Sequence, residues 1–214
     1  MSLWLTYGLL GAVAGPVVTV VGRRVALREP LSWSSAVRSE WAAMLAASAL
    51  LSLVLVEVAE RRPAAAGAVS WLAIMGLLLA SIDWACHRLP QILVGTLLAG
   101  GAIQLGLAAF VQHDGAGRVL RAGGALAAVF AVTVTMALVS PEGWGAGDVT
   151  LSTTVAFFLG WFSWSHVAIG LGLALALGAV TFGVLRARRA YWQGLQIPLG
   201  PALVFAPVCT ILLM

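Results

Sequence analysis

Charged residues are scarce in this 214-residue chain, and their scarcity decides its class. They make up 9% of the sequence, whereas hydrophobic residues make up 61%. Soluble domains carry roughly 25% charged residues, so a soluble fold could not bury this much apolar surface. Several apolar stretches reach the ~18–20 residues that a helix needs to cross the hydrocarbon core of a bilayer. The composition therefore predicts one integral membrane domain, residues 1–214, surrounded by the lipid bilayer.

Lysine is absent, and all twelve basic residues are arginines in short loops, not interleaved with aromatic residues. This distribution indicates membrane topology and argues against nucleic-acid binding. Cysteine is almost absent too: Cys86 and Cys209 lie 123 positions apart, which predicts neither a disulfide framework nor a zinc site. The chain also lacks an HExxH motif, a serine nucleophile elbow and a cysteine with a convincing histidine partner. We therefore expect no metal and no cofactor.

Apolar runs separated by charged or proline-marked loops predict an all-α bundle of about eight transmembrane spans. No Gly/Ser linker, soluble domain or repeat interrupts the series. The sixth run is short and rich in Ser and Thr, so it is the least secure span. The expected helices cover residues 3–21, 41–58, 65–82, 91–112, 119–139, 149–162, 166–185 and 197–214.

The arginines predict the orientation of these spans, because basic residues accumulate in cytoplasmic loops. With the N-terminus outside, the cytoplasmic loops hold eight of the twelve arginines and the outer loops hold four. We therefore expect the N-terminus outside. The eight are Arg23, Arg24, Arg28, Arg38, Arg88, Arg186, Arg188 and Arg189, and the four are Arg61, Arg62, Arg118 and Arg121.

Two of the three aspartates adjoin predicted spans on the cytoplasmic side: Asp83 ends the third helix and Asp148 opens the sixth. An ionisable group at membrane depth costs about 2.5–3.5 kcal/mol on insertion scales, so it is a functional candidate. Asp114 lies beside His113 in an outer loop and is expected to be solvated.

Asp148 ends the segment 141–148, in which Gly143, Gly145 and Gly147 alternate with other residues. Such glycines allow unusual backbone conformations and let a neighbouring chain approach closely. A turn that delivers one carboxylate is one interpretation. The alternative is an ordinary helix N-cap, because Asp often caps a helix.

Asp83 lies seven residues before Pro90, which restricts Leu89 to extended geometry and can open the fourth helix. The alternative interpretation is an aspartate at a helix end that pairs with His87 or Arg88.

Taken together, the two aspartates favour peptide-bond hydrolysis by an aspartic protease mechanism. Two adjacent carboxylates cannot both ionise, so they share a proton. The ionised member would take a proton from water, while the protonated member would support the developing oxyanion. The pair titrates as a unit, so the residues alone assign neither role.

Three segments resemble the prepilin-peptidase family of GxGD membrane aspartic proteases. The first is Asp83 followed by Leu89-Pro90, and the second is Gly145-Ala146-Gly147-Asp148 followed by Leu151. The third is Pro198-Leu199-Gly200-Pro201, which is similar to the Pro-x-Gly-Pro string of the family's last helix. The resemblance covers residues 71–214 well, and the N-terminal third only loosely, through Gly11 to Gly15.

The resemblance implies that Asp83 and Asp148 are the catalytic residues, supported by the glycines and prolines of the three segments. It implies a substrate class as well: pilin-like precursors with a basic leader before a hydrophobic helix, cut on the cytoplasmic side of a bacterial inner membrane. For Pro198, Gly200 and Pro201, helix packing remains an alternative interpretation.

The chain departs from the family pattern at two places. Members that also methylate the new N-terminus carry paired Cys-x-x-Cys motifs in the first cytoplasmic loop, and residues 22–40 contain no cysteine. We therefore expect proteolysis without methylation. Thr150 stands where the family has a lysine, which removes a cation near Asp148.

Two rival functions remain at the level of sequence. Buried carboxylates also serve as proton relays, so a proton-coupled transporter is one alternative, although its carboxylates would lie near the midplane of the membrane. A non-catalytic component of a pilus or secretion assembly is the other, and Thr150 favours it slightly. His166, on the outer side, is expected to be a satisfied interface histidine.

Overall fold

The fold was obtained as a computed structural model, which describes residues 3–27, 33–86, 89–139, 145–188 and 199–214. Within these ranges there are eight α-helices, one 3-10 turn and no strand, so the all-helical prediction is confirmed. The helices are α1 (Leu3–Leu27), α2 (Trp33–Arg61), α3 (Ala66–Cys86), α4 (Gln91–Val111), α5 (Gly115–Val139), α6 (Ala146–Phe162), α7 (Trp164–Arg188) and α8 (Gly200–Leu213), with η1 (Pro63–Ala65) between α2 and α3.

Six helices of the described part are long and apolar enough to cross a membrane: α1 to α5 and α7. This supports the prediction of a multi-pass membrane protein. The other two are shorter, since α6 has 17 residues and α8 has 14. At 1.5 Å per residue they are about 25 Å and 21 Å long, against about 30 Å of hydrocarbon.

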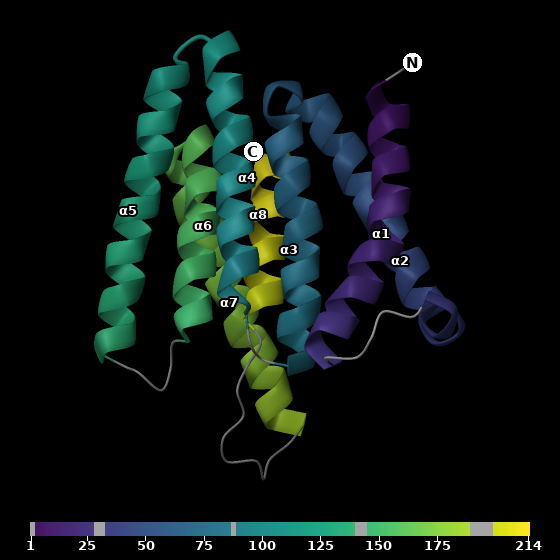
Figure 1. The fold of residues 1–214 in the computed structure, drawn as a ribbon. Coiled ribbons are helices and arrows are strands. Elements are labelled where there is room, and N and C mark those ends of the chain that lie inside the picture. Colours follow the sequence, from purple (N-terminus) through teal and green to yellow (C-terminus); the bar gives the residue numbers. More distant parts are fainter. Residues whose placement is uncertain (1–2, 28–32, 87–88, 140–144, 189–198) are drawn as a thin grey trace.

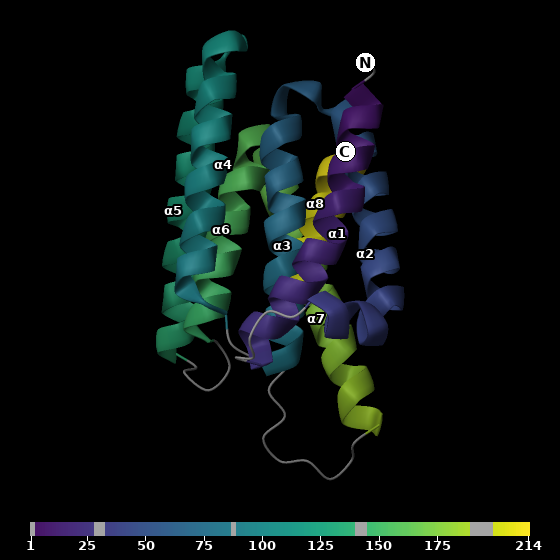
Figure 2. The ribbon, with the colours of Figure 1, turned by 45° about the vertical axis from the view of Figure 1, so that its right-hand side comes forward.

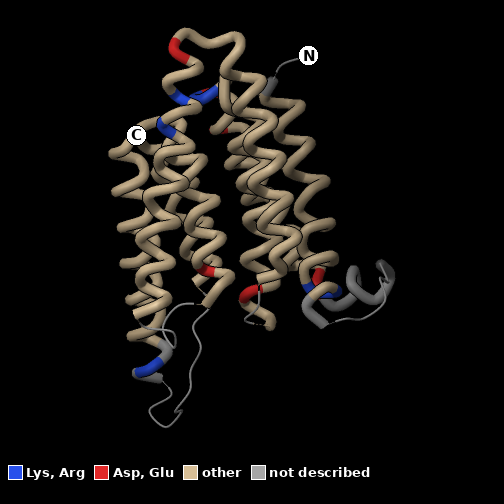
Figure 3. Tube along the Cα trace, turned by 60° about the vertical axis from the view of Figure 1, so that its left-hand side comes forward, with Lys and Arg blue, Asp and Glu red and all other residues tan. Residues whose placement is uncertain are grey.

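Successive helices run in opposite directions, and both termini lie at the same end of the bundle (Figure 1). We call this the termini end. The opposite end, called the site end, carries the last turns of α1, α3, α5 and α7 and the first turns of α2, α4, α6 and α8. Charged residues gather at these two ends and leave the middle of the bundle apolar (Figure 3).

Helix α3 occupies the centre of the bundle. Of the residues in its membrane-spanning stretch 61% are buried, against 17–28% in the other five long helices. It contacts α1, α2, α4 and α8, while α6 contacts α4, α5, α7 and α8. The pair α1–α2 lies on one side of the bundle, and α4, α5 and α6 lie on the other (Figures 1 and 2). Large apolar side chains on the outer helices remain exposed, as lipid contact requires.

Six helices extend beyond their predicted ranges: α1, α2, α3, α5, α6 and α7. Helix α1 ends at Leu27 instead of residue 21, α2 covers 33–61 instead of 41–58, and α3 ends at Cys86 instead of residue 82. Arg23 and Arg24, which suggested a loop, belong to α1, and Glu40 belongs to α2. Arg23 of α1 lies 2.6 Å from the buried Glu40 of α2, so this ion pair joins the two helices. Asp83 consequently lies inside α3 and not at its end.

Arginines at the termini end bond to the carbonyl groups that end the two short helices. Arg121 of α5 donates to the carbonyls of Gly160, Trp161 and Phe162 at the end of α6, at 2.8–3.1 Å. The last four carbonyls of a helix have no partner within the helix. A cation there also complements the helix dipole.

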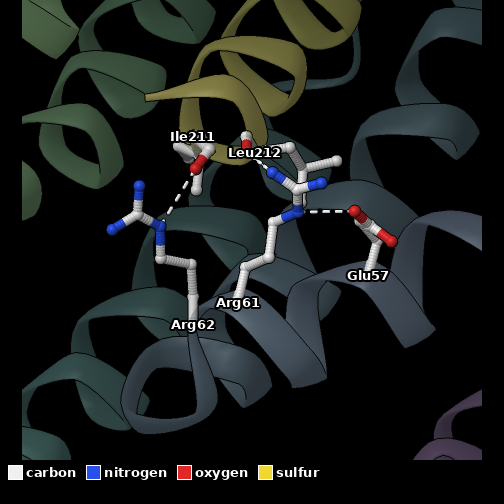
Figure 4. A network of polar contacts seen from close by, with 5 residues as sticks. All are labelled: Glu57, Arg61, Arg62, Ile211 and Leu212. Carbon is white, nitrogen blue, oxygen red and sulfur yellow. Dashed lines mark hydrogen bonds and ion pairs between the residues drawn. The ribbon is translucent and has the colours of Figure 1, made fainter.

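The end of α8 is held in the same way. Arg62 donates to the carbonyl of Ile211 at 3.1 Å and Arg61 donates to that of Leu212 at 3.3 Å (Figure 4). Arg61 also pairs with Glu57 one turn earlier on α2. The last carbonyls of both short helices are therefore bonded to side chains of longer neighbours.

Helices α1 and α2 pack with their backbones in close approach. A Cβ atom at Gly11 would collide with the backbone nitrogen of Ser52. The hydroxyls of Ser52 and Ser48 donate to the carbonyls of Gly8 and Ala12, at 2.9 and 3.1 Å. Small residues allow this packing, which is common between membrane helices.

We predict that Gly11→Ala lowers the free energy of unfolding by about 1–3 kcal/mol, the usual cost of overpacking. Gly95→Ala is the matched control, because a Cβ atom there meets nothing within 4 Å. That variant should be unchanged or up to about 1 kcal/mol more stable, since Ala suits a helix better than Gly. The measurement is SDS-induced unfolding in mild micelles, followed by tryptophan fluorescence. Equal stability of the two variants would contradict the packing.

Candidate active site

Asp83 accepts a hydrogen bond from the backbone of another helix. Its side chain lies one turn before the end of α3 and is 5% exposed. Its Oδ2 accepts the N–H of Gly200, the first residue of α8, at 2.9 Å. The first N–H groups of a helix lack partners within the helix, and the helix dipole favours a negative charge beside them. The start of α8 therefore stabilises the ionised form of Asp83.

Gly200 is needed for the close approach of α8 to Asp83. A Cβ atom at this position would lie 2.7 Å from Oδ2 of Asp83. Pro201 follows in the first turn, where a missing N–H costs nothing. The predicted supporting residues Gly200 and Pro201 thus lie at the candidate site, whereas the predicted Pro198 lies outside the described residues.

Asp148 is the third residue of α6 and not its N-cap. The N-cap is Gly145, so the alternative that Asp148 is the N-cap of this helix is wrong. Gly145 has φ −76° and ψ 148°, which any residue can adopt, so no unusual backbone conformation is needed there. At Gly147 a Cβ atom would lie 2.9 Å from Cβ of Leu89, so this glycine serves close approach.

One pocket of about 330 Å³ at the site end holds both carboxylates. It lies between the end of α3, the start of α4 and the start of α6. Pro90 is the N-cap of α4, and its carbonyl accepts the N–H of Leu93 at 3.0 Å, so it sets where α4 begins beside the pocket. The lining residues are Asp83, Leu89, Gln91, Gly145, Ala146, Gly147 and Asp148.

The two carboxylates have different surroundings. Burial, followed by the nearby charge of Asp83, raises the pKa of Asp148 to about 6, and a backbone hydrogen bond from Gly145 opposes this shift. Asp148 lies in the first turn of α6, which is not among the six helices long enough to cross a membrane. Asp83, in contrast, bonds to the N-terminus of α8. At a pH below about 6 the arrangement therefore favours a protonated Asp148.

No family model, curated protein or solved structure matches this chain. The site is interpreted from its own geometry. Among the described residues, no three His, Cys, Asp or Glu side chains are grouped as ligands of a metal ion would be.

The structure brings five sequence-predicted residues to one place: Asp83, Asp148, Gly145 and Gly147 line the pocket, and Gly200 contacts Asp83. His87 and Arg88, the alternative partners of Asp83, lie outside the described residues. Asp114 and His166 lie towards the termini end, where the Nδ1 of His166 bonds to the Ser163 hydroxyl at 2.7 Å.

Sequence reasoning missed three lining residues of the pocket: Leu89, Gln91 and Ala146. Leu89 and Gln91 flank Pro90, and Ala146 lies between the two motif glycines. Leu89 and Ala146 belong to the motif segments and Gln91 follows one of them, which was the available signal. Gln91 is exposed and could offer an amide to a bound peptide.

We predict that removing the charge of Asp83 lowers the pKa of Asp148. In the wild type, the infrared carbonyl band of protonated Asp148 should disappear as the pH rises through about 6. In Asp83→Asn it should disappear at a lower pH, because a neighbouring negative charge no longer opposes ionisation. The band is assigned by its loss in Asp148→Asn. Asp114→Asn should leave it unchanged, and an equal midpoint in Asp83→Asn would contradict the coupling.

Proposed function

We propose that this chain is a membrane-embedded aspartic endopeptidase that removes the basic leader of prepilin-like precursors. The observation that carries the proposal is the single pocket shared by Asp83 and Asp148 at one end of the bundle. The three motif segments support it, since those described contribute residues to this pocket or contact one of its carboxylates.

The surroundings of each carboxylate support a division of roles. Ionised Asp83 takes a proton from a water molecule as the water oxygen bonds to the scissile carbonyl carbon. Protonated Asp148 donates a hydrogen bond to the carbonyl oxygen and stabilises its developing negative charge. When the C–N bond breaks, the proton held by Asp83 passes to the leaving amine. A pocket of about 330 Å³ has room for several water molecules.

We place the site end in the cytoplasm and infer that α6 and α8 complete eight crossings, with the N-terminus outside. The arginine distribution supports this orientation. Of the four arginines assigned to the outer side, Arg61, Arg62 and Arg121 bond to helix-end carbonyls. Arg118 lies over the ring of Trp161 at 5.8 Å. Each of these four therefore has a structural contact, as Arg23 and Arg186 of the other eight also do, so the support for the orientation is the excess of eight over four.

The product is proposed to lack an added methyl group, because residues 22–40 contain no cysteine. Thr150 stands where the prepilin-peptidase family has a lysine, and its side chain carries no charge. Its hydroxyl donates to the carbonyls of Ala146 and Gly147 within its own helix, at 3.1 and 3.0 Å. Thr150 therefore adds no charge beside the pair.

Asp83→Asn and Asp148→Asn should each reduce leader cleavage by at least about a hundredfold, the scale of a lost general acid or base. Asn keeps the size of Asp and most of its hydrogen bonds but cannot ionise. The assay is co-expression with a prepilin-like precursor, followed by gel mobility. Mass spectrometry of the new N-terminus should find no methyl group that depends on this protein alone.

Asp114→Asn is the internal control for these variants. Asp114 is exposed and has φ 61°, a conformation that Asn also adopts readily. It should cleave at the wild-type rate. Cleavage at the wild-type rate by both site variants would instead reject the proposal and favour a transporter or an assembly component.

Gly200→Ala should also reduce cleavage strongly, because its methyl group would push α8 away from the Asp83 carboxylate. We expect a fall in kcat of at least about tenfold, since the N–H that stabilises ionised Asp83 is displaced. Gly183→Ala is the matched control: a Cβ atom there meets nothing within 4 Å. Equal rates for the two variants would show that the contact of α8 with Asp83 does not contribute.

A further inference from the structure

We infer that an apolar groove along α8 binds the hydrophobic helix of the precursor while its leader lies at the carboxylates. The inference rests on the proposed function and names a binding surface for its substrate. The groove has a volume of about 310 Å³ and lies between α2, α3 and α8. Its lining residues are Leu50, Leu51, Val54, Ala73, Leu77, Ala80, Pro201, Val204, Phe205, Val208, Cys209 and Leu212.

The groove is long enough to hold several turns of a helix. Its lining on α8 runs from Pro201 to Leu212, which is about 16 Å at 1.5 Å per residue. Part of this lining is open, since Phe205 is 56% exposed and Leu50 is 43% exposed. On α3 the lining residues Ala73 and Ala80 have small side chains, which leave space in the groove. An amphipathic or apolar helix lying in an apolar groove is a common mode of peptide recognition.

Two of the helices that line the groove, α8 and α3, lead from it to the candidate site. On α8, Pro201 lines the groove and its neighbour Gly200 bonds to Asp83. On α3, Ala80 lines the groove one turn before Asp83. A chain whose scissile bond reaches Asp83 can therefore continue into the groove without leaving the protein surface. This continuity favours a substrate helix as the occupant.

A second apolar groove, of about 200 Å³, provides the comparison. It lies among α5, α6, α7 and α8, and its lining includes Val132, Met136 and Leu171. It is smaller than the groove along α8 and has no lining residue on α3. It also approaches the candidate site, because its lining includes Leu203, three residues after Gly200, and Ser152, which donates to the carbonyl of Asp148. The second groove is therefore the rival docking surface for the substrate helix, and the groove along α8 differs from it in reaching Asp83 along α3 through Ala80.

The kinetic test uses two substrates with the same leader and scissile bond. One continues into an apolar helix of about 20 residues, and the other ends a few residues after the bond. Phe205→Ala should raise KM for the long substrate about five- to tenfold, as loss of an aromatic anchor does. It should leave kcat and the short substrate unchanged. Ala73→Phe, which fills the groove, should raise that KM by about tenfold or more.

Phe130→Ala is the matched control, because Phe130 is 48% exposed on α5 and lines neither groove. It should leave the KM of both substrates unchanged. If Phe205→Ala and Phe130→Ala give the same KM for the long substrate, the inference is wrong.

The cross-linking test does not need cleavage. After Cys86→Ser, Cys209 is the only thiol of the chain and lines the groove. In an Asp83→Asn background, Cys209 should form a disulfide with a cysteine placed in the helix of the long substrate, using copper phenanthroline as oxidant. A thiol moved to the second groove, by Met136→Cys with Cys209→Ser, should react at least about tenfold more slowly.

The outcomes distinguish the two proposals. If the wild type cleaves neither substrate but Cys209 forms the cross-link, the docking surface stands and the proposed protease function fails. If the wild type cleaves both but the two thiols react equally, the groove holds only lipid and the docking inference fails.

Discussion

The backbone polar groups at the ends of α6 and α8 are the constraint on which the polar chemistry of this bundle depends. Both helices are shorter than the hydrocarbon layer is thick, and their last turns contain buried residues such as Trp161 and Ile211. Water cannot satisfy such groups, and each unpaired one would cost several kcal/mol in an apolar environment. Longer neighbours supply the partners: Arg121 at the end of α6, and Arg61 and Arg62 at the end of α8.

At the other end of the two helices the backbone groups without partners are N–H donors instead of carbonyl acceptors. The first turn of a helix presents unpaired N–H groups and the positive end of its dipole, so it stabilises carboxylates. Asp83 accepts from the start of α8, and Asp148 lies in the first turn of α6. The carboxylates thus lie where the fold has spare donors, and the cations lie where it has spare acceptors. The pocket between the carboxylates follows from where these helices begin.

Sequence patterns predicted the eight helices and singled out Asp83 and Asp148, because apolar runs and scarce charges are local features. They could not predict the contacts that join distant segments. Gly200 bonds to an aspartate 117 positions earlier, and Arg62 bonds to a carbonyl 149 positions later. The glycine motif was predicted to allow unusual backbone conformations and the close approach of a neighbouring segment. Gly145 has an ordinary conformation, whereas Gly147 does permit the close approach of Leu89. The loops around Arg23 and Glu40 were misplaced because their ion pair is visible only in three dimensions.

The position of the carboxylates limits what the proposed protease could cut. Hydrolysis consumes water, and the pocket lies at the site end of the bundle, whereas the middle of the bundle is apolar. A peptide bond within a long hydrophobic helix would have to be drawn out of lipid to reach Asp83, at the cost of exposing apolar side chains. A bond at the junction of a polar leader and a hydrophobic helix needs no such movement. The groove along α8 begins next to Gly200, so the helix can remain in an apolar environment while the junction lies in the pocket. A proton-coupled transporter is expected to have its carboxylates near the midplane of the membrane, where they can be reached from either side. The carboxylates of this chain lie at one end of the bundle instead.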